Sequence, residues 1–335
     1  MNTEEFSYDL PTELVAFYPE ERRDLCKLMV VDRGNGNIQH RKFYELEDLL
    51  HEGDSLVLND TKVIPARIYG NGGSGKRVEV LLVHKINTRR WKCLVRNPRD
   101  GMEIEFDWGL SGKLKRNGRE EWFIDFQGGV DEYLLRHGKM PLPPYITREP
   151  EERDYTYYQT VYAKESGAIA APTAGLHFSD ELLCRLEQIG VEINYLTLHV
   201  GIGTFQPVRT KQVENHHMHD EYRGIPEETS RAINQAKQEG RRVIAVGTTV
   251  VRALESSVDD FGTVRRTSGF TNLFIYPGFQ FKVVDALVTN FHLPRSTLMM
   301  LVSAFAGKEL IFRAYEEAIA KKYRLLSYGD AMLII

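Results

Sequence analysis

Three histidines share one local pattern, an imidazole held between apolar residues and lying beside Gly, Thr or Pro. They are His177 in Gly167–Phe178, His199 in Leu198–Pro207 and His292 in Asn290–Thr297. Three imidazoles at strand ends can hold a catalytic zinc ion, and a single imidazole can act as a general base. The sequence has no His-Glu-x-x-His motif, and one hydrogen bond would satisfy each ring. The metal site is therefore the weaker of the two hypotheses.

A polar loop carries a second group of histidines at 216, 217 and 219, followed by Asp220 and Glu221. Adjacent histidines in a polar loop are more often solvated than ligating. We retain His219 with Glu221 as a candidate acid–base pair at the end of this loop.

Hydroxyl and charged residues follow a predicted buried strand at 242–247. Thr248 and Thr249 would place hydroxyls and free backbone amides at the start of a helix, a geometry that binds ligands. Arg252 and Glu255 are three residues apart, so they share one helix face and either pair with each other or contact a ligand.

The segment Gly167–Phe178 is almost free of charge and rich in small side chains. Small residues let a backbone come close to another element or to a ligand. A buried crossover and one wall of a ligand cavity explain this composition equally well.

Several familiar sites are missing from the sequence. Gly70–Lys76 lacks the spacing of a phosphate-binding loop, and Gly201–Gly203 is only a Gly-x-Gly. There is no Gly-x-Ser-x-Gly, and the three cysteines form no Cys-x-x-Cys pair. These absences disfavour a nucleotide hydrolase, a dinucleotide enzyme and covalent catalysis.

The composition is that of a globular protein, with 42% hydrophobic and 27% charged residues. No run of about 18 apolar residues would span a membrane, and the N-terminus lacks a signal segment, so we expect a cytoplasmic protein. The net charge is −4, yet 17 basic residues face 12 acidic ones between residues 60 and 150. This uneven charge is explained equally well by binding of the basic module to a phosphate backbone and by a chance distribution of charged residues.

The pattern of apolar and turn-forming residues changes at about residue 62. Short strand-like segments separated by turn formers then continue to residue 126, and all three tryptophans fall among them, which predicts a small barrel or sandwich. A mixed α/β pattern returns after Tyr155. The expected helices are Ser179–Ile189, Pro226–Gly240 and Glu309–Lys322. The expected strands include Val191–Leu198 and Leu273–Gly278. The apolar segment Thr297–Phe305 could form either a helix or a strand.

Long motifs are spread along the whole chain. They are Tyr8–Leu14, Leu58–Arg67, Tyr158–Ala163, Ala170–Phe178, Leu198–Phe205, Met218–His219, Ala245–Thr249, Phe274–Gly278, Asp285–Pro294 and Ser327–Ala331. Together they resemble the S-adenosylmethionine:tRNA ribosyltransferase-isomerases of queuosine biosynthesis, almost from end to end of the chain.

The resemblance implies an unusual use of S-adenosylmethionine as co-substrate, with no metal and no tightly bound cofactor. The ribosyl part is transferred to 7-aminomethyl-7-deazaguanine at the wobble position of a tRNA anticodon and isomerised, which gives epoxyqueuosine-tRNA. Adenine and methionine leave. This chemistry needs a base beside the sulfonium and a donor for the departing adenine. We also expect a monomer without membrane contact.

The resemblance implies an α/β fold in which a mixed-sheet main domain, residues 1–60 plus 151–335, carries an inserted β-barrel domain. The barrel, residues 61–150, is the candidate tRNA contact. The candidate catalytic residues are His177, His199, His292 and His219. The candidate substrate-binding residues are Thr173, Gly175, Thr248, Thr249, Arg252, Glu255, Asn290, Asn59 and Arg67. The candidate RNA-binding residues are Arg22, Arg23, Lys76, Arg89, Arg90 and Arg116.

The chain departs from the family pattern at a few positions. Cys26-Lys27 stands where Ser-Arg is usual, which changes a candidate nucleoside or phosphate contact, and Ala168 lacks a usual hydroxyl. Two other classes remain open: a histidine–zinc hydrolase, which would contain metal, and a non-catalytic RNA-binding protein, which would release no adenine.

Overall fold

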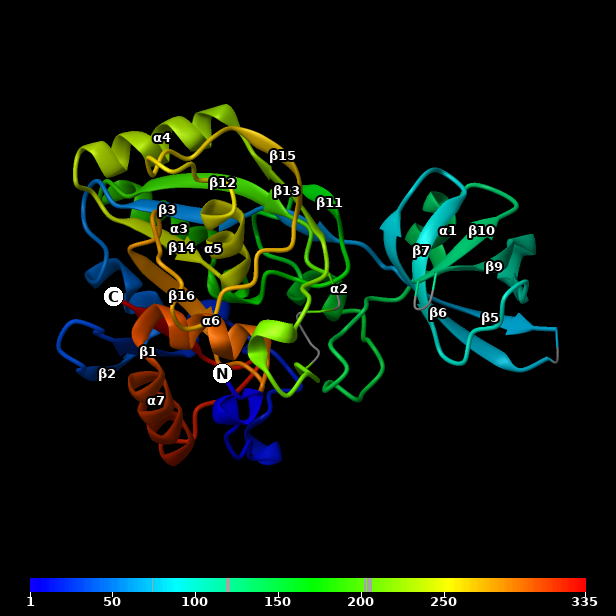
Figure 1. Ribbon diagram of the computed structural model, residues 1–335, viewed down its shortest axis with the longest axis horizontal. Helices are drawn as coiled ribbons and strands as arrows, with labels where there is room; N and C mark the ends of the chain where they lie inside the picture. Colours follow the sequence, from blue (N-terminus) through cyan, green and yellow to red (C-terminus); the bar gives the residue numbers. More distant parts are fainter. Residues whose placement is uncertain (74, 119–120, 202, 204–206) are drawn as a thin grey trace.

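An α/β body and a separate closed β-barrel make up the structure, a computed structural model that describes residues 1–73, 75–118, 121–201, 203 and 207–335 (Figure 1). The mixed α/β class is confirmed, and of the two architectures expected for the basic module, the barrel is the one found. The barrel lies at one end of the long axis of the molecule.

A nine-stranded mixed sheet, counted over the described residues, forms the centre of the body, with strand order β15-β13-β12-β3-β14-β16-β17-β1-β2. Neighbours from β12 to β16 are parallel, as are β17 and β1, whereas the remaining pairs are antiparallel. The strands are β1 (Lys27–Val31), β2 (Ile38–Lys42), β3 (Ser55–Asn59), β12 (Glu192–Leu198), β13 (Glu221–Ile225), β14 (Val243–Val246), β15 (Thr267–Thr271), β16 (Ala286–Asn290) and β17 (Ala331–Ile334).

Helices cover both faces of this sheet, because its central strands are apolar on both sides. One face packs against α4 (Glu227–Gln238), α5 (Thr248–Glu255), α6 (Thr297–Ala306) and α7 (Lys308–Ala320). The other face packs against α3 (Asp180–Gln188) and the 3₁₀ helix η4 (Phe43–Asp48). The body is therefore a three-layer structure.

The sequence predicted most of these elements. Ser179 caps α3 through its hydroxyl, which accepts a hydrogen bond from the Leu182 amide. The ambiguous Thr297–Phe305 segment is the helix α6. The strand expected at Leu273–Gly278 was wrong: the strand there is β15, which ends at Thr271 because its partner β13 pairs only with Thr267–Thr271.

Six antiparallel strands close the barrel, in the order β10-β7-β6-β5-β8-β9. They alternate inward apolar and outward polar residues, and Leu114 and Ile124 lie fully buried in the core. The strands are β5 (Arg67–Gly72), β6 (Arg77–Lys85), β7 (Arg90–Val95), β8 (Glu103–Phe106), β9 (Ser111–Asn117) and β10 (Glu121–Phe126), and the helix α1 (Asp131–His137) follows them.

The body and the barrel meet at a short parallel pair of strands, β4 (Thr61–Val63) and β11 (Glu165–Ala168). Ile169, directly after β11, is 4% exposed and packs into the hydrophobic core of the barrel. The segment that begins at Gly167 therefore holds the barrel against the body.

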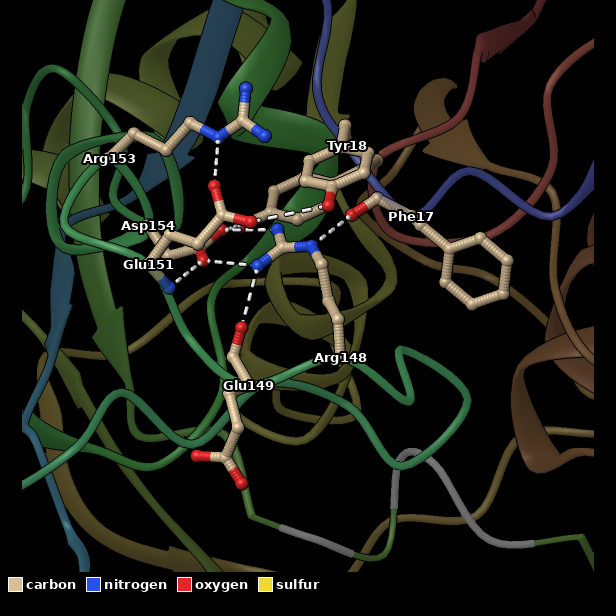
Figure 2. A network of polar contacts seen from close by, with 8 residues as sticks. Phe17, Tyr18, Arg148, Glu149, Glu151, Arg153 and Asp154 are labelled. Atoms are coloured by element: carbon tan, nitrogen blue, oxygen red, sulfur yellow. Dashed lines mark hydrogen bonds and ion pairs between the residues drawn. The ribbon is translucent and has the colours of Figure 1, made fainter.

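An ion-pair network fastens the chain where it returns from the barrel at α2 (Asp154–Tyr157), as Figure 2 shows. Arg148 makes two hydrogen bonds with the buried Asp154 carboxylate, at 2.6 and 2.7 Å, and donates a third to the Phe17 carbonyl. The Tyr328 hydroxyl also donates to Asp154. Although burial raises the Asp154 pKa, Arg148 and the other donors outweigh this and hold it below its usual value.

Within the part of the chain that the structure describes, none of the helices is long and apolar enough to cross a membrane.

Candidate active site

A cavity in the body opens where β14 and β16 end, beside β3. These strands are parallel, so their carboxyl ends meet at one edge of the sheet, the place where α/β folds bind ligands. No Asp, Glu, Lys or Arg is among the described residues of its wall. The wall consists of Tyr145, Ala171, Pro172, Thr173, Ala174, Val200, Gly247, Thr248, Thr249, Thr289, Asn290, Phe291, His292, Leu293, Ser296, Leu298, Leu326 and Ser327.

The start of α5 forms one side of the cavity. Gly247 ends β14 with a φ of +95°, which turns the chain into the helix, and Thr248 and Thr249 follow as its first residues. Both threonines are at least nine-tenths buried. Because the first amides of a helix lack partners within it, this edge presents hydrogen-bond donors beside two hydroxyls.

Asn59, at the end of β3, is committed to the fold. Its amide nitrogen donates to the Leu198 carbonyl at 2.9 Å and to the Thr249 hydroxyl at 3.3 Å. Its amide oxygen accepts from the backbone amides of Leu198 and Thr61. The side chain fixes the position of Thr249 rather than facing a ligand.

Asn290, the last residue of β16, has a fixed amide orientation. Its nitrogen lies 3.3 Å from the Leu326 carbonyl, which can only accept, and 3.0 Å from Nε2 of His177. Its oxygen is buried and has no hydrogen-bond partner in the described structure. A buried acceptor without a partner costs about 1–3 kcal/mol, so this oxygen is the clearest sign that the cavity takes a hydrogen-bond donor.

His177 stands behind Asn290 and is neutral. Its Nε2 accepts from Asn290, which leaves the proton on Nδ1, 3.2 Å from Sγ of Cys26. Burial lowers the pKa of His177 to about 3, with Arg23 and Arg324 adding repulsion. Burial raises the pKa of the Cys26 thiol. Both ring nitrogens are engaged, so the structure places His177 as a support for Asn290.

His292 lies in the wall of the same cavity. Its Nε2 is 2.8 Å from the Thr289 hydroxyl, and burial lowers its pKa to about 3. The backbone of His292 is held by Tyr315, whose hydroxyl accepts from its amide, and by Tyr8, whose hydroxyl donates to its carbonyl. No hydrogen bond to Nδ1 occurs among the described residues, so this nitrogen is available to a ligand.

His199 lies at the junction of body and barrel. Its Nδ1 is 2.7 Å from the Thr61 hydroxyl, and its ring stacks on Tyr222. The ring also covers Gly167, where a Cβ would lie only 2.7 Å from Nε2. Burial lowers the pKa of His199, and the Glu165 carboxylate partly opposes this.

Of the two alternatives for Arg252 and Glu255, the one in which they pair with each other is not found. Arg252 forms a buried ion pair with Glu221 of β13, which also accepts from the Gly201 amide at 2.8 Å. Glu255 accepts hydrogen bonds from the amides of residues 282–284. Both side chains are therefore held by the fold, and Glu221 contacts Arg252 rather than the exposed His219.

Two further predicted substrate contacts lie elsewhere. Gly175 is packed against Tyr162, whose hydroxyl would be 2.1 Å from a Cβ at this position. Arg67 lies on the barrel, where its Nη2 donates to the Leu142 carbonyl. Of the motif Leu198–Phe205, residues 202, 204 and 205 lie outside the described residues, so the ligand contacts expected of its Gly-x-Gly stay a prediction.

The predicted RNA-binding residues do not form one surface. Arg23 is half-buried, and its guanidinium donates to the carbonyls of Thr156, Gln159 and Leu176 in the body. Arg22 bonds to the buried Asp24 carboxylate through Nε at 3.1 Å.

The other four lie on the barrel. Arg90 grips Asp125 with two hydrogen bonds, which lower the pKa of that carboxyl to about 2. Arg89 is exposed, and the Arg116 amide bonds to Asp100. Lys76 borders a large groove that contains Arg67 but neither Arg89 nor Arg90.

Four polar residues of the cavity wall were not among the candidate site residues: Tyr145, Thr289, Ser296 and Ser327. The Tyr145 hydroxyl bonds to Ser327, so the segment returning from the barrel reaches the cavity wall. Ser327 opens the motif Ser327–Ala331, which was the available signal, whereas nothing local singles out Tyr145.

The three histidines each have a different polar partner: Asn290 for His177, Thr61 for His199 and Thr289 for His292. Among the described residues, no group of three or more His, Cys, Asp or Glu side chains could hold a metal ion.

Comparison with known proteins covers the whole chain. The family profile described as queuosine biosynthesis protein matches residues 3–334. A protein of Geobacter metallireducens named S-adenosylmethionine:tRNA ribosyltransferase-isomerase is 51% identical over 342 residues, and one of the same name from Trichlorobacter lovleyi is 49% identical over 341; both chains are covered completely each time.

A solved structure is similar in fold as well as in sequence. The crystal structure of an S-adenosylmethionine tRNA ribosyltransferase from Thermotoga maritima is 39% identical, covers 99% of this chain and 100% of its own, and superposes with a TM-score of 0.57. Together with the profile match, these similarities show that the chain belongs to the queuosine biosynthesis protein family.

Proposed function

We propose that this chain is an S-adenosylmethionine:tRNA ribosyltransferase-isomerase. It transfers the ribosyl part of S-adenosylmethionine to 7-aminomethyl-7-deazaguanine at the wobble position of a tRNA anticodon and isomerises it. Epoxyqueuosine-tRNA, adenine and methionine are the products. S-adenosylmethionine is a co-substrate, no tightly bound cofactor is used, and the enzyme acts in the cytoplasm as a monomer.

One observation carries the location of this reaction: three sequence motifs spread over residues 171–293 contribute to a single uncharged cavity. Residues 171–174, Thr248 with Thr249, and Thr289–Leu293 line it together. The adenosyl group carries no charge of its own, so an uncharged cavity with a few fixed polar groups suits it.

Asn290 is the specificity residue of this site. Its fixed amide oxygen accepts a hydrogen bond from the exocyclic amine of adenine, while the amides at the start of α5 and the hydroxyls of Thr248 and Thr249 hold the ribose. His177 does not touch the ligand; it keeps the Asn290 oxygen turned toward it.

His292 is the proton-transfer group. A hydroxyl can donate or accept, so Thr289 can bond to either tautomer of the neutral ring. With Nε2 held by the Thr289 hydroxyl, His292 takes up at Nδ1 the proton removed beside the sulfonium and returns it to the departing adenine, so the ring is charged only transiently. The low pKa of His292 is consistent with this transfer and argues against a ring that stays protonated.

The cavity must widen to admit substrate. Its volume is about 50 Å³, whereas an engineered cavity that admits benzene measures about 150 Å³. Binding of an adenosyl group therefore requires the walls of the cavity to move apart. The hydrogen bond between Tyr145 and Ser327 joins two parts of this wall.

The test is product formation by the wild-type protein. S-adenosylmethionine is incubated with tRNA that carries 7-aminomethyl-7-deazaguanine, and free adenine, free methionine and the mass of the modified nucleoside are measured. Equal amounts of adenine and methionine, formed only with the precursor tRNA, support the proposal.

Two controls separate the alternatives. Binding of tRNA without adenine release would contradict the proposal and indicate a non-catalytic RNA-binding protein. Activity that a chelator abolishes, in a protein with one bound metal per chain, would favour metal chemistry instead.

A further inference from the structure

A groove of about 1210 Å³ runs along the barrel next to the body. Strands β5 and β6, the segment after β7 and the start of β8 form most of its wall. The returning segment at Pro141, Leu142 and Pro144 and the side chain of Ile169 complete it. This groove is separate from the cavity in the body, with which it shares no lining residue.

Cations outnumber acids in the groove wall. Its five basic residues are Arg67, Lys76, Arg77, Arg96 and Arg99, and its three acidic residues are Glu79, Asp100 and Glu103. Arg67 is within 3.2 Å of Glu79, and Arg77 lies over the ring of Tyr69. Lys76, Arg96 and Arg99 are exposed, and none of them forms an ion pair with a residue that the structure describes.

Most cations elsewhere on the described part of the barrel are neutralised by neighbours, and the exposed Arg89 is an exception. Lys85 pairs with Asp131, Lys92 with Glu121, Lys113 with Glu103, Lys115 and Arg90 with Asp125, and Arg136 with Glu132. The groove therefore gathers three exposed cations, Lys76, Arg96 and Arg99, that form no ion pair with a described residue. A concave surface of unpaired cations attracts a polyanion.

One short segment of the chain links the groove to the cavity. The side chain of Ile169 reaches the groove, and Ala171, two residues later, lines the cavity. The Ile169 amide bonds to the carbonyl of Val200, which also lines the cavity. The segment 169–171 therefore contributes wall residues to both the groove and the cavity.

We propose that this groove binds the phosphate backbone of an RNA stem-loop, with Lys76, Arg77, Arg96 and Arg99 as the phosphate contacts. The inference rests on the proposed function, because it assigns the surface that brings the RNA substrate beside the cavity. It replaces the dispersed RNA-binding set expected from the sequence, of which only Lys76 belongs to the groove. Arg90 is committed to Asp125 and takes no part.

The test compares two double variants that remove the same charge from the barrel. Arg96→Gln with Arg99→Gln alters the groove, and Lys85→Gln with Arg136→Gln alters paired cations outside it. The dissociation constant of full-length precursor tRNA is measured at several salt concentrations for both and for the wild type. Thermal unfolding and the KM for S-adenosylmethionine at saturating tRNA serve as checks, and both should match the wild type.

The groove variant should bind tRNA about tenfold more weakly, and its dependence of log K on log salt should be shallower by about 1.4–1.8, since each lost phosphate contact removes about 0.7–0.9. The control variant should keep the wild-type slope. Wild-type affinity and slope in the groove variant, or equal losses in both variants, would overturn the inference. Failure of the wild type to release adenine would contradict the proposed function, whereas a tRNA affinity that tracks the groove charge would still support the groove.

Discussion

Replacing His177 or His292 by glutamine should make the body less sensitive to acid. Burial lowers the pKa of each ring to about 3, whereas a histidine in an unfolded chain titrates near about 6.5. As the pH falls below about 6.5, the histidine binds a proton in the unfolded chain but stays neutral in the folded chain. Each ring then lowers the free energy of unfolding, and the loss continues until about pH 3.

The size of the effect follows from these two pKa values. Each buried neutral histidine lowers the unfolding free energy by roughly 1 kcal/mol or slightly more for every pH unit below about 6.5, so at pH 4.5 the loss is about 3 kcal/mol. Between pH 7.5 and 4.5, the drop in unfolding free energy should therefore be about 3 kcal/mol smaller in either glutamine variant than in the wild type. The exposed His217, changed to Gln, is the matched control and should leave the drop unaltered.

Urea unfolding at the two pH values measures this difference, followed by two signals. Far-ultraviolet circular dichroism reports mainly the body, which carries six of the seven α-helices in the described residues. Tryptophan fluorescence reports the barrel, because Trp91, Trp108 and Trp122 all lie there. The variants should change the first signal more than the second.

A His177→Gln protein with the same acid sensitivity as the wild type would refute the reasoning for that ring. It would mean that His177 titrates normally in the folded chain, and the positioning role that we give it beside Asn290 would then be untenable.

Asp154→Asn should lower the unfolding free energy by about 3–5 kcal/mol in urea titrations, because it leaves the Arg148 guanidinium without its carboxylate. The control, Arg153→Gln, removes an exposed ion pair and should change the unfolding free energy by less than about 0.5 kcal/mol. Gly175→Ala should lower the thermal midpoint, because the new methyl group clashes with Tyr162. Adding Tyr162→Phe should restore part of the midpoint, since the Tyr162 hydroxyl is the closest atom. If the second substitution restores nothing, the strain does not come from that hydroxyl. Thr249→Val should raise the KM for S-adenosylmethionine about tenfold and Thr249→Ser should not; equal values for both would remove the hydroxyl from the site.

The barrel was predictable because its signal is local. Each strand alternates apolar and polar residues within a few positions, as Glu103–Phe106 does, and turn formers such as Asn117 and Gly118 separate the strands. The start of α3 at Ser179 is equally local. Such features need no knowledge of which elements meet in space.

The partners of charged side chains were not predictable in this way. Arg252 and Glu255 share a helix face, but Glu221, 31 residues earlier, reaches Arg252 first because β13 packs against α5. The lysines and arginines of the barrel look alike in the sequence. Only the closed barrel shows which of them, such as Arg90, already have a carboxylate and which, such as Arg96, do not.

The segments that line the cavity could be predicted from the sequence, but the positions of the individual histidines could not. The motifs around Thr173, Thr248 and His292 indicated three of its walls, and the structure brings them together. The different positions of the three histidines could not be read from their shared pattern. His199 and Val200 directly follow the end of β12, yet Val200 lines the cavity while His199 lies against Thr61 and Gly167.

The most direct test of the central claim is a crystal structure of this protein with S-adenosylmethionine bound. The adenosyl group should lie in a widened cavity between Thr249 and His292, with its exocyclic amine within hydrogen-bond distance of the Asn290 oxygen. An adenosyl group bound in the barrel groove, or anywhere else while this cavity stays closed, would contradict the account.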